Sequence, residues 1–151
     1  MNRTGRTTLP RGAFTLVELV VVIVILGILA AIAVPKLINT SGVATDNGLK
    51  QSLSIVRDAI DYYASQHAGA YPGADGNETT FKNDLKPYIR GSFPKSPVEN
   101  KVDTVRIETA AGNTPANAGS GHGWVYNNQD GTFIVNSTAK SHDGTTTYDQ
   151  F

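Results

Sequence analysis

The hydrophobic pattern divides the chain into one long apolar run and a polar remainder. From Phe14 to Val34 every residue is apolar except Thr15, Glu18 and the small Gly27. About 20 apolar residues in a helix, at a rise of about 1.5 Å per residue, extend about 30 Å and can cross the hydrocarbon core of a bilayer. The run therefore predicts a membrane-spanning helix near the start of the chain.

Beyond this run the apolar positions take the period of an amphipathic helix. They recur at spacings of 4, 3, 4 and 3 at Leu49, Leu53, Val56, Ile60 and Tyr63. We expect the helix to continue to about residue 68, because Gly69 suits a left-handed C-cap. Pro35 removes one helical hydrogen bond and predicts a kink. Gly42 and Gly48 each cost about 1 kcal/mol in a helix interior, so the part from Pro35 to Gly48 should be the weakest.

The remaining pattern predicts a second short helix and a small sheet. The helix is expected at 81–89, broken by Pro87. Alternating apolar and polar residues predict three strands, at 104–109, 123–127 and 132–136. The last two flank a four-residue turn that ends in Gly131, which is typical of a β-hairpin. The expected fold class is α+β, with the second half of the long helix packed on a small antiparallel sheet. We expect the core to come from Leu53, Val56, Ile60, Tyr63, Val105, Ile107, Trp124, Tyr126, Phe133 and Val135.

The charges around the apolar run are asymmetric. Arg3, Arg6 and Arg11 precede it, and the next charge after it is Lys36. An excess of positive charge on one side predicts that the leader stays in the cytoplasm. Glu18 lies inside the span, where an acid costs about 2.5–3.5 kcal/mol on insertion scales, and is by default a functional residue.

A secretory signal peptide is the first alternative for this run. The small residues Ala31 and Ala33 would then form the cleavage site. The run is longer than the apolar region of such a peptide, which usually has about 7–15 residues. It also carries an acid near its start. We therefore favour a retained helix preceded by a short leader.

The residues RGAFTLVEL resemble the processing signal of type IV pilins and type II secretion pseudopilins. In that superfamily a short basic leader ends in a small residue, followed by Phe and by Glu as fifth residue of the mature chain. Cleavage between Ala13 and Phe14 makes Glu18 the fifth residue and places Pro35 where pilins commonly carry a kinking proline. The family usually has Gly as last leader residue, so cleavage after Gly12 is the alternative, with Glu18 then sixth.

The resemblance implies a division of the chain and a life cycle. Residues 1–13 would be the leader, 14–35 the membrane and assembly helix, and 36–151 a periplasmic pilin-like domain. A prepilin peptidase would remove the leader and N-methylate Phe14. Glu18 would then pair with the N-terminal amine of a neighbouring subunit as the chains polymerise, since a buried charge is tolerable when it is paired. The alternative for Glu18 is a tolerated acid that reaches the lipid headgroups.

The resemblance also implies partners and a location. These are the inner membrane and its lipid, an inner-membrane assembly platform, and other pseudopilins or minor pilins. The order of a YPG loop, a short helix and a proline-bearing loop is similar to the major pseudopilin of type II secretion. In related filaments the helix after the proline can stretch, and we carry this over as a hypothesis for Pro35 to Gly48. The chain cannot form the C-terminal disulfide of many type IVa pilins, because it has no cysteine.

Composition argues against nucleic acid and against catalysis. Without the three leader arginines, ten basic residues face thirteen acidic ones, whereas a nucleic-acid partner favours a basic surface. This weakens the alternative of a DNA-uptake pilin. His67, His122 and His142 show no metal-ligand spacing and are expected to be solvated surface residues. The glycine-rich residues 119–123 match neither a phosphate loop nor a nucleophile elbow. We therefore expect no enzyme.

One metal hypothesis comes from the resemblance, since major pseudopilins bind calcium in the loop after the last strands. Asp143 and Asp149 offer hard oxygen ligands in that region. The alternative is two solvated acids in a polar tail. Taken together, the sequence predicts a structural subunit of a type II secretion pseudopilus or type IV pilus-like filament. The rival from another class is a periplasmic binding module or enzyme that the N-terminal helix merely anchors.

Overall fold

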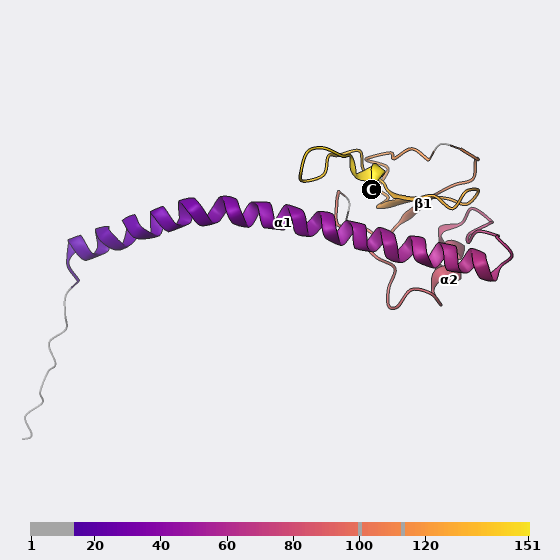
Figure 1. Cartoon of the computed structure of the whole chain (residues 1–151), viewed down its shortest axis with the longest axis horizontal. Helices are drawn as coiled ribbons and strands as arrows, with labels where there is room; N and C mark the ends of the chain where they lie inside the picture. Colours follow the sequence, from indigo (N-terminus) through magenta and orange to yellow (C-terminus); the bar gives the residue numbers. More distant parts are fainter. Residues whose placement is uncertain (1–13, 100, 113) are drawn as a thin grey trace, which may run out of the picture. The chain divides into compact units, whose positions relative to one another are not determined.

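The long helix α1 (Leu16–Gln66) is the first element of the computed structural model, which describes residues 14–99, 101–112 and 114–151 (Figure 1). The predicted leader, 1–13, and with it Ala13, lies outside the described residues. α1 continues through Pro35, whose predicted kink stays a prediction. By its contacts the chain forms two units that meet between Ile38 and Asn39, and each is described by itself.

The end of α1 is a left-handed turn, as predicted, but it begins one residue early. Ala68 has a φ of 54° and Gly69 a φ of 86°. The N–H of Gly69 donates to the carbonyl of Ala64 at 2.8 Å, which satisfies one of the last helical carbonyls. Ala68 therefore takes the first left-handed position, at a cost of about 1–2 kcal/mol relative to glycine.

The second helix, α2 (Glu78–Leu85), lies earlier in the chain than predicted. Its N-cap is Asn77, whose side chain accepts a hydrogen bond from the N–H of Thr79 at 2.8 Å. The helix ends at Leu85, although Lys86, its C-cap, still has helical backbone angles (φ −55°, ψ −36°). Pro87 has no N–H with which to continue the helical hydrogen bonds. The prediction of 81–89 was thus right in kind and wrong in register.

The sheet contains β1 (Val105–Glu108), β2 (Trp124–Asn127) and β3 (Phe133–Val135), in that order. β2 and β3 form the predicted antiparallel hairpin, and the α+β layout is confirmed. The prediction of a wholly antiparallel sheet is wrong, because β1 pairs with β2 in parallel. A parallel pair needs a crossover of about a dozen residues or more, and the long loop from 109 to 123 supplies it.

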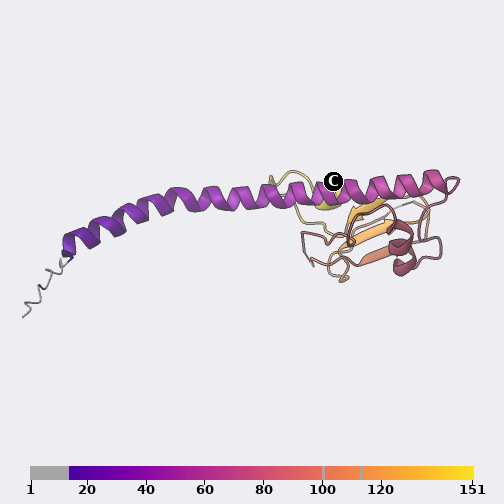
Figure 2. The same ribbon diagram turned by 90° about the horizontal axis from the view of Figure 1, so that it is seen from below.

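The core of the second unit joins α1 to the sheet, and Figure 2 shows this part of α1 lying along the strands. All four residues of β2 are buried. Tyr63 and Ile107, predicted as core residues, are half-buried at its edge, whereas Phe81 and Leu85 of α2 were missed. The largest fully buried side chains are Trp124, Tyr126, Phe81, Phe133, Leu49, Leu53, Ile60, Leu85, Val56, Val105, Val125 and Val135.

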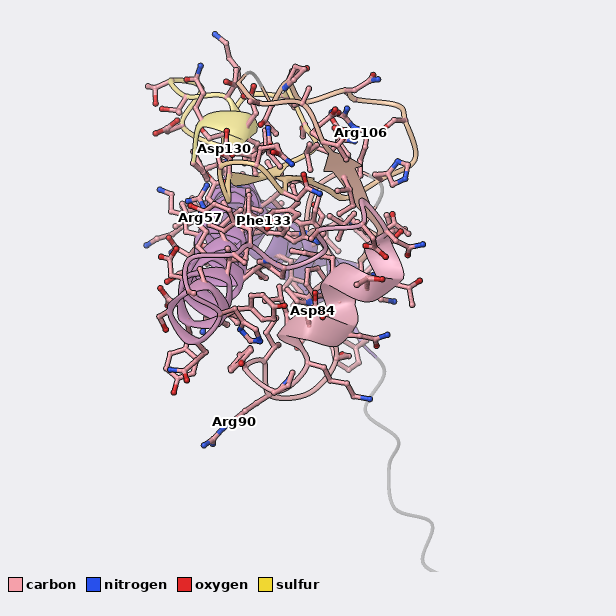
Figure 3. The ribbon with its side chains drawn as sticks, turned by 90° about the vertical axis from the view of Figure 1, so that its right-hand side faces the viewer. Arg57, Asp84, Arg90, Arg106, Asp130 and Phe133 are labelled. Atoms are coloured by element: carbon pink, nitrogen blue, oxygen red, sulfur yellow. The ribbon has the colours of Figure 1, made fainter. Side chains whose placement is uncertain are left out.

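Arg57 links α1 to the outer edge of the sheet. Its Nε donates to the carbonyl of Phe133 at 3.0 Å, and Figure 3 shows the two residues side by side. Its Nη2 donates to the backbone oxygen of Phe151 at 2.6 Å. Partial burial lowers the pKa of Arg57, and both hydrogen bonds go to backbone oxygens that compensate for lost water.

We predict that Leu53→Ala lowers the free energy of unfolding by about 2–5 kcal/mol, because Leu53 is fully buried between α1 and the sheet. Ile55→Ala is the matched control on the same helix, since Ile55 is 44% exposed; it should cost less than about 1 kcal/mol. Chemical unfolding of the full chain in mild detergent, followed by the fluorescence of the single tryptophan, Trp124, measures both. Equal losses for the two variants would contradict this packing.

Candidate functional site

The first turn of α1 is closed by a reciprocal pair of side chains, Thr15 and Glu18. Glu18 Oε2 accepts hydrogen bonds from the N–H of Thr15 at 3.0 Å and from its hydroxyl at 2.8 Å. The N–H of Glu18 donates in return to Thr15 Oγ1 at 3.2 Å. This is a capping box, which satisfies helix N–H groups that otherwise lack partners.

The capping box gives Glu18 a partner within its own chain. Thr and Glu three residues apart before an apolar run are a legible signal for such a box, and the sequence reasoning missed it. The partners considered for Glu18 from the sequence were a neighbouring subunit and the lipid headgroups, but no residue of the same chain. The anionic side chain also lies at the positive end of the helix dipole. Phe14, the predicted first residue after cleavage, lies immediately before the box and is 83% exposed.

The rest of the first unit presents apolar surface all round the helix. Every large apolar side chain from Phe14 to Val34 is at least 42% exposed. A helix that is hydrophobic on all faces belongs in a protein core or in a membrane. Among the described residues, α1 is the one helix long and apolar enough to span a membrane, judged by length and composition.

The three histidines lie apart in the second unit. His67 stacks on Tyr63 at the end of α1, with ring centroids 3.9 Å apart. His122 is half-buried in the crossover loop, and His142 is exposed in the C-terminal segment. Within the ranges that the structure describes, no group of three His, Cys, Asp or Glu residues could hold a metal ion.

The two aspartates of the calcium hypothesis have different environments. Asp143 Oδ1 accepts hydrogen bonds from the hydroxyl of Ser141 and from the N–H and hydroxyl of Thr145. These bonds hold the pKa of Asp143 well below its usual range. Asp149 is half-buried in the short 3₁₀ helix η1 (Tyr148–Gln150), and its Oδ1 is buried without a hydrogen-bond partner. The calcium hypothesis thus depends on two carboxylates. One of them, that of Asp143, already accepts hydrogen bonds from the residues of its own turn.

Comparison with known proteins identifies the first part of the chain. The family described as "Prokaryotic N-terminal methylation motif" matches residues 10–34. No curated protein and no solved structure gives a significant match. The chain carries a prepilin motif of the type IV pilin and pseudopilin kind, which confirms the resemblance seen in the sequence. The motif marks it as a prepilin-peptidase substrate of that kind.

The calcium hypothesis predicts that the full chain melts at a lower temperature in EGTA than in calcium, because bound ligand stabilises only the folded state. Asp149→Asn should remove the difference, since it takes the charge from the carboxylate with an unpartnered oxygen. Asp130→Asn, in the hairpin turn, is the control and should keep it. Coincident melts of the unchanged chain in calcium and in EGTA would remove calcium from the account.

Proposed function

We propose that the chain is a structural subunit of a type II secretion pseudopilus or a related type IV pilus-like filament, polymerised through α1. The observation that carries this proposal is the exposed apolar helix that directly follows the prepilin motif. Its apolar side chains are exposed in the part of the chain that the structure describes, so we infer that lipid or other helices cover them. Lipid covers it while subunits are stored in the membrane, and the helices of neighbouring subunits cover it in the filament.

Glu18 sets the axial register of assembly in this proposal. Removal of the leader after Ala13 gives Phe14 a positively charged amine. In the low-dielectric filament centre an unpaired carboxylate is strongly unfavourable, so Glu18 of one subunit pairs with the amine of the next. The capping box is compatible with this pairing, because a carboxylate has about four acceptor positions and Thr15 uses one oxygen.

The second unit supports the secretion branch of the proposal. The chain passes from the YPG loop at Tyr71 to α2 and the proline-bearing loop at 93–98 before it enters the sheet. This order resembles the major pseudopilin. The leader would face the cytoplasm and the second unit the periplasm, with the inner-membrane platform and other pseudopilins or minor pilins as partners.

We expect the second unit to have a structural role and not a catalytic one. A hollow of about 470 Å³ on the outer face of α1 is lined by Ile55, Asp58, Ala59, Tyr62 and Tyr88. It offers one carboxylate and two phenols, whereas covalent catalysis needs a nucleophile paired with a base. The activity that we propose is mechanical.

We predict that Glu18→Gln blocks filament assembly while membrane insertion and leader removal continue. Glutamine keeps an oxygen that can accept the capping hydrogen bonds of Thr15, but it has no charge to pair with an amine. Asp58→Asn, which removes an acid further along α1, is the control and should assemble. Membrane fractionation, recovery of sheared filaments and subunit crosslinking measure the steps separately. Normal filaments from Glu18→Gln would refute the pairing role.

A further inference from the structure

The C-terminal segment 139–151, here called the strap, folds back on itself. The N–H of Ser141 donates to the carbonyl of Thr146 at 2.8 Å, next to an antiparallel bridge between Lys140 and Thr147. The carboxylate of Asp143 closes the turn between them. The strap is therefore a small hydrogen-bonded loop that can dock as a unit.

The strap docks on α1 through Asp46. Asp46 Oδ2 accepts a hydrogen bond from the N–H of His142 at 3.0 Å, and Asp46 Oδ1 accepts one from the hydroxyl of Tyr148 at 2.8 Å. Tyr148 is 9% exposed. Burial and the neighbouring Asp46 raise the pKa of Tyr148 to about 12, so its hydroxyl keeps its proton and stays a donor at neutral pH.

Two further contacts extend the docking along the same helix. The Nζ of Lys50 lies 4.5 Å from the centre of the Phe151 ring, and Arg57 donates to the backbone oxygen of Phe151. Figures 1 and 2 both show the yellow C-terminal residues beside this part of α1. The strap thus contacts α1 from Gly42 to Arg57.

Gly42 allows the closest approach. A Cβ added at Gly42 would lie 2.1 Å from His142 Nδ1, far inside van der Waals contact. A Cβ at Gly48 would meet nothing within 4 Å. The two glycines weaken α1 equally by propensity, but only Gly42 makes room for the strap.

We propose that the strap is a latch that holds α1 helical from Gly42 to Gly48 and sets the limit to which α1 can unwind from Pro35. Among the side chains of α1 that the structure describes, Leu49 is the first that is buried in the core, so the turn before it, from Gly42, needs another tertiary support. The strap supplies it through Asp46 and Gly42. The latch itself is a property of the unassembled chain, and its effect in the filament rests on the proposed function.

Hydrogen exchange of the full chain dispersed in detergent tests the latch. Tyr148→Phe removes the hydroxyl that Asp46 accepts and keeps the ring. A hydrogen bond to a charged group is strong enough that amides 42–50 should exchange about tenfold faster or more, with amides 56–66 unchanged. Tyr62→Phe is the control on an exposed part of α1. Identical profiles for the two variants at 42–50 would overturn the proposal.

The glycine pair gives an independent test. Alanine favours the helix over glycine, so Gly48→Ala should slow exchange at 42–50 about fivefold. Gly42→Ala should instead speed it, because the new methyl group displaces the His142 ring and loosens the strap. Adding His142→Ala to Gly42→Ala removes the clash and should slow exchange again. Equal slowing by Gly42→Ala and Gly48→Ala would show that the strap does not pack there.

Assembled filaments test the limit on unwinding. In filaments of the unchanged chain, the amides from Gly42 onward should be protected against hydrogen exchange. In filaments of Tyr148→Phe, the amides from Gly42 to Gly48 should lose this protection. Equal protection of both filaments at 42–48 would overturn the limit. If the unchanged chain forms no filament at all, the proposed function fails, and the exchange of the dispersed chain still decides the latch.

Discussion

The structure depends on one constraint: in the part of the chain that the structure describes, the large apolar side chains from Phe14 to Val34 are all at least 42% exposed. Burying a large apolar side chain is worth about 1.5–3 kcal/mol, so about 15 exposed side chains of this kind create a large demand for lipid or for other helices. Glu18 gains its importance from this setting. The capping box with Thr15 makes an acid tolerable at the start of such a helix. In the proposed filament, the carboxylate of Glu18 would pair with the amine of a neighbouring subunit.

The second unit meets a different constraint, because it must be stable without disulfides. A three-stranded sheet and one face of α1 supply a modest core, and α2 adds Phe81 and Leu85 to it. Two side chains of α1 then fasten the end of the chain: Arg57 at Phe151, and Asp46 at Tyr148. These contacts are hydrogen bonds, which can open and close without redox chemistry.

Much of this fold could be read from the sequence, and the failures have physical reasons. The helices and the hairpin follow from period and turn chemistry, which are local. The direction of β1 depends on where a long polar loop returns the chain, and no local pattern records that. The role of Asp46 could not be predicted from the sequence, because its partners His142 and Tyr148 lie 96 and 102 residues further along the chain. The capping box, in contrast, is local, and Thr15 and Glu18 at a spacing of three are sufficient to predict it.

If α1 begins a processed, assembling subunit, the mature N-terminus is the residue that the prepilin peptidase exposes. Mass analysis of the protein from its native membrane should find a chain that begins at N-methylated Phe14. A chain that begins at Val34 would instead show an ordinary signal peptide cleaved after Ala33. That result would contradict the account, because the apolar helix and Glu18 would be absent from the mature protein.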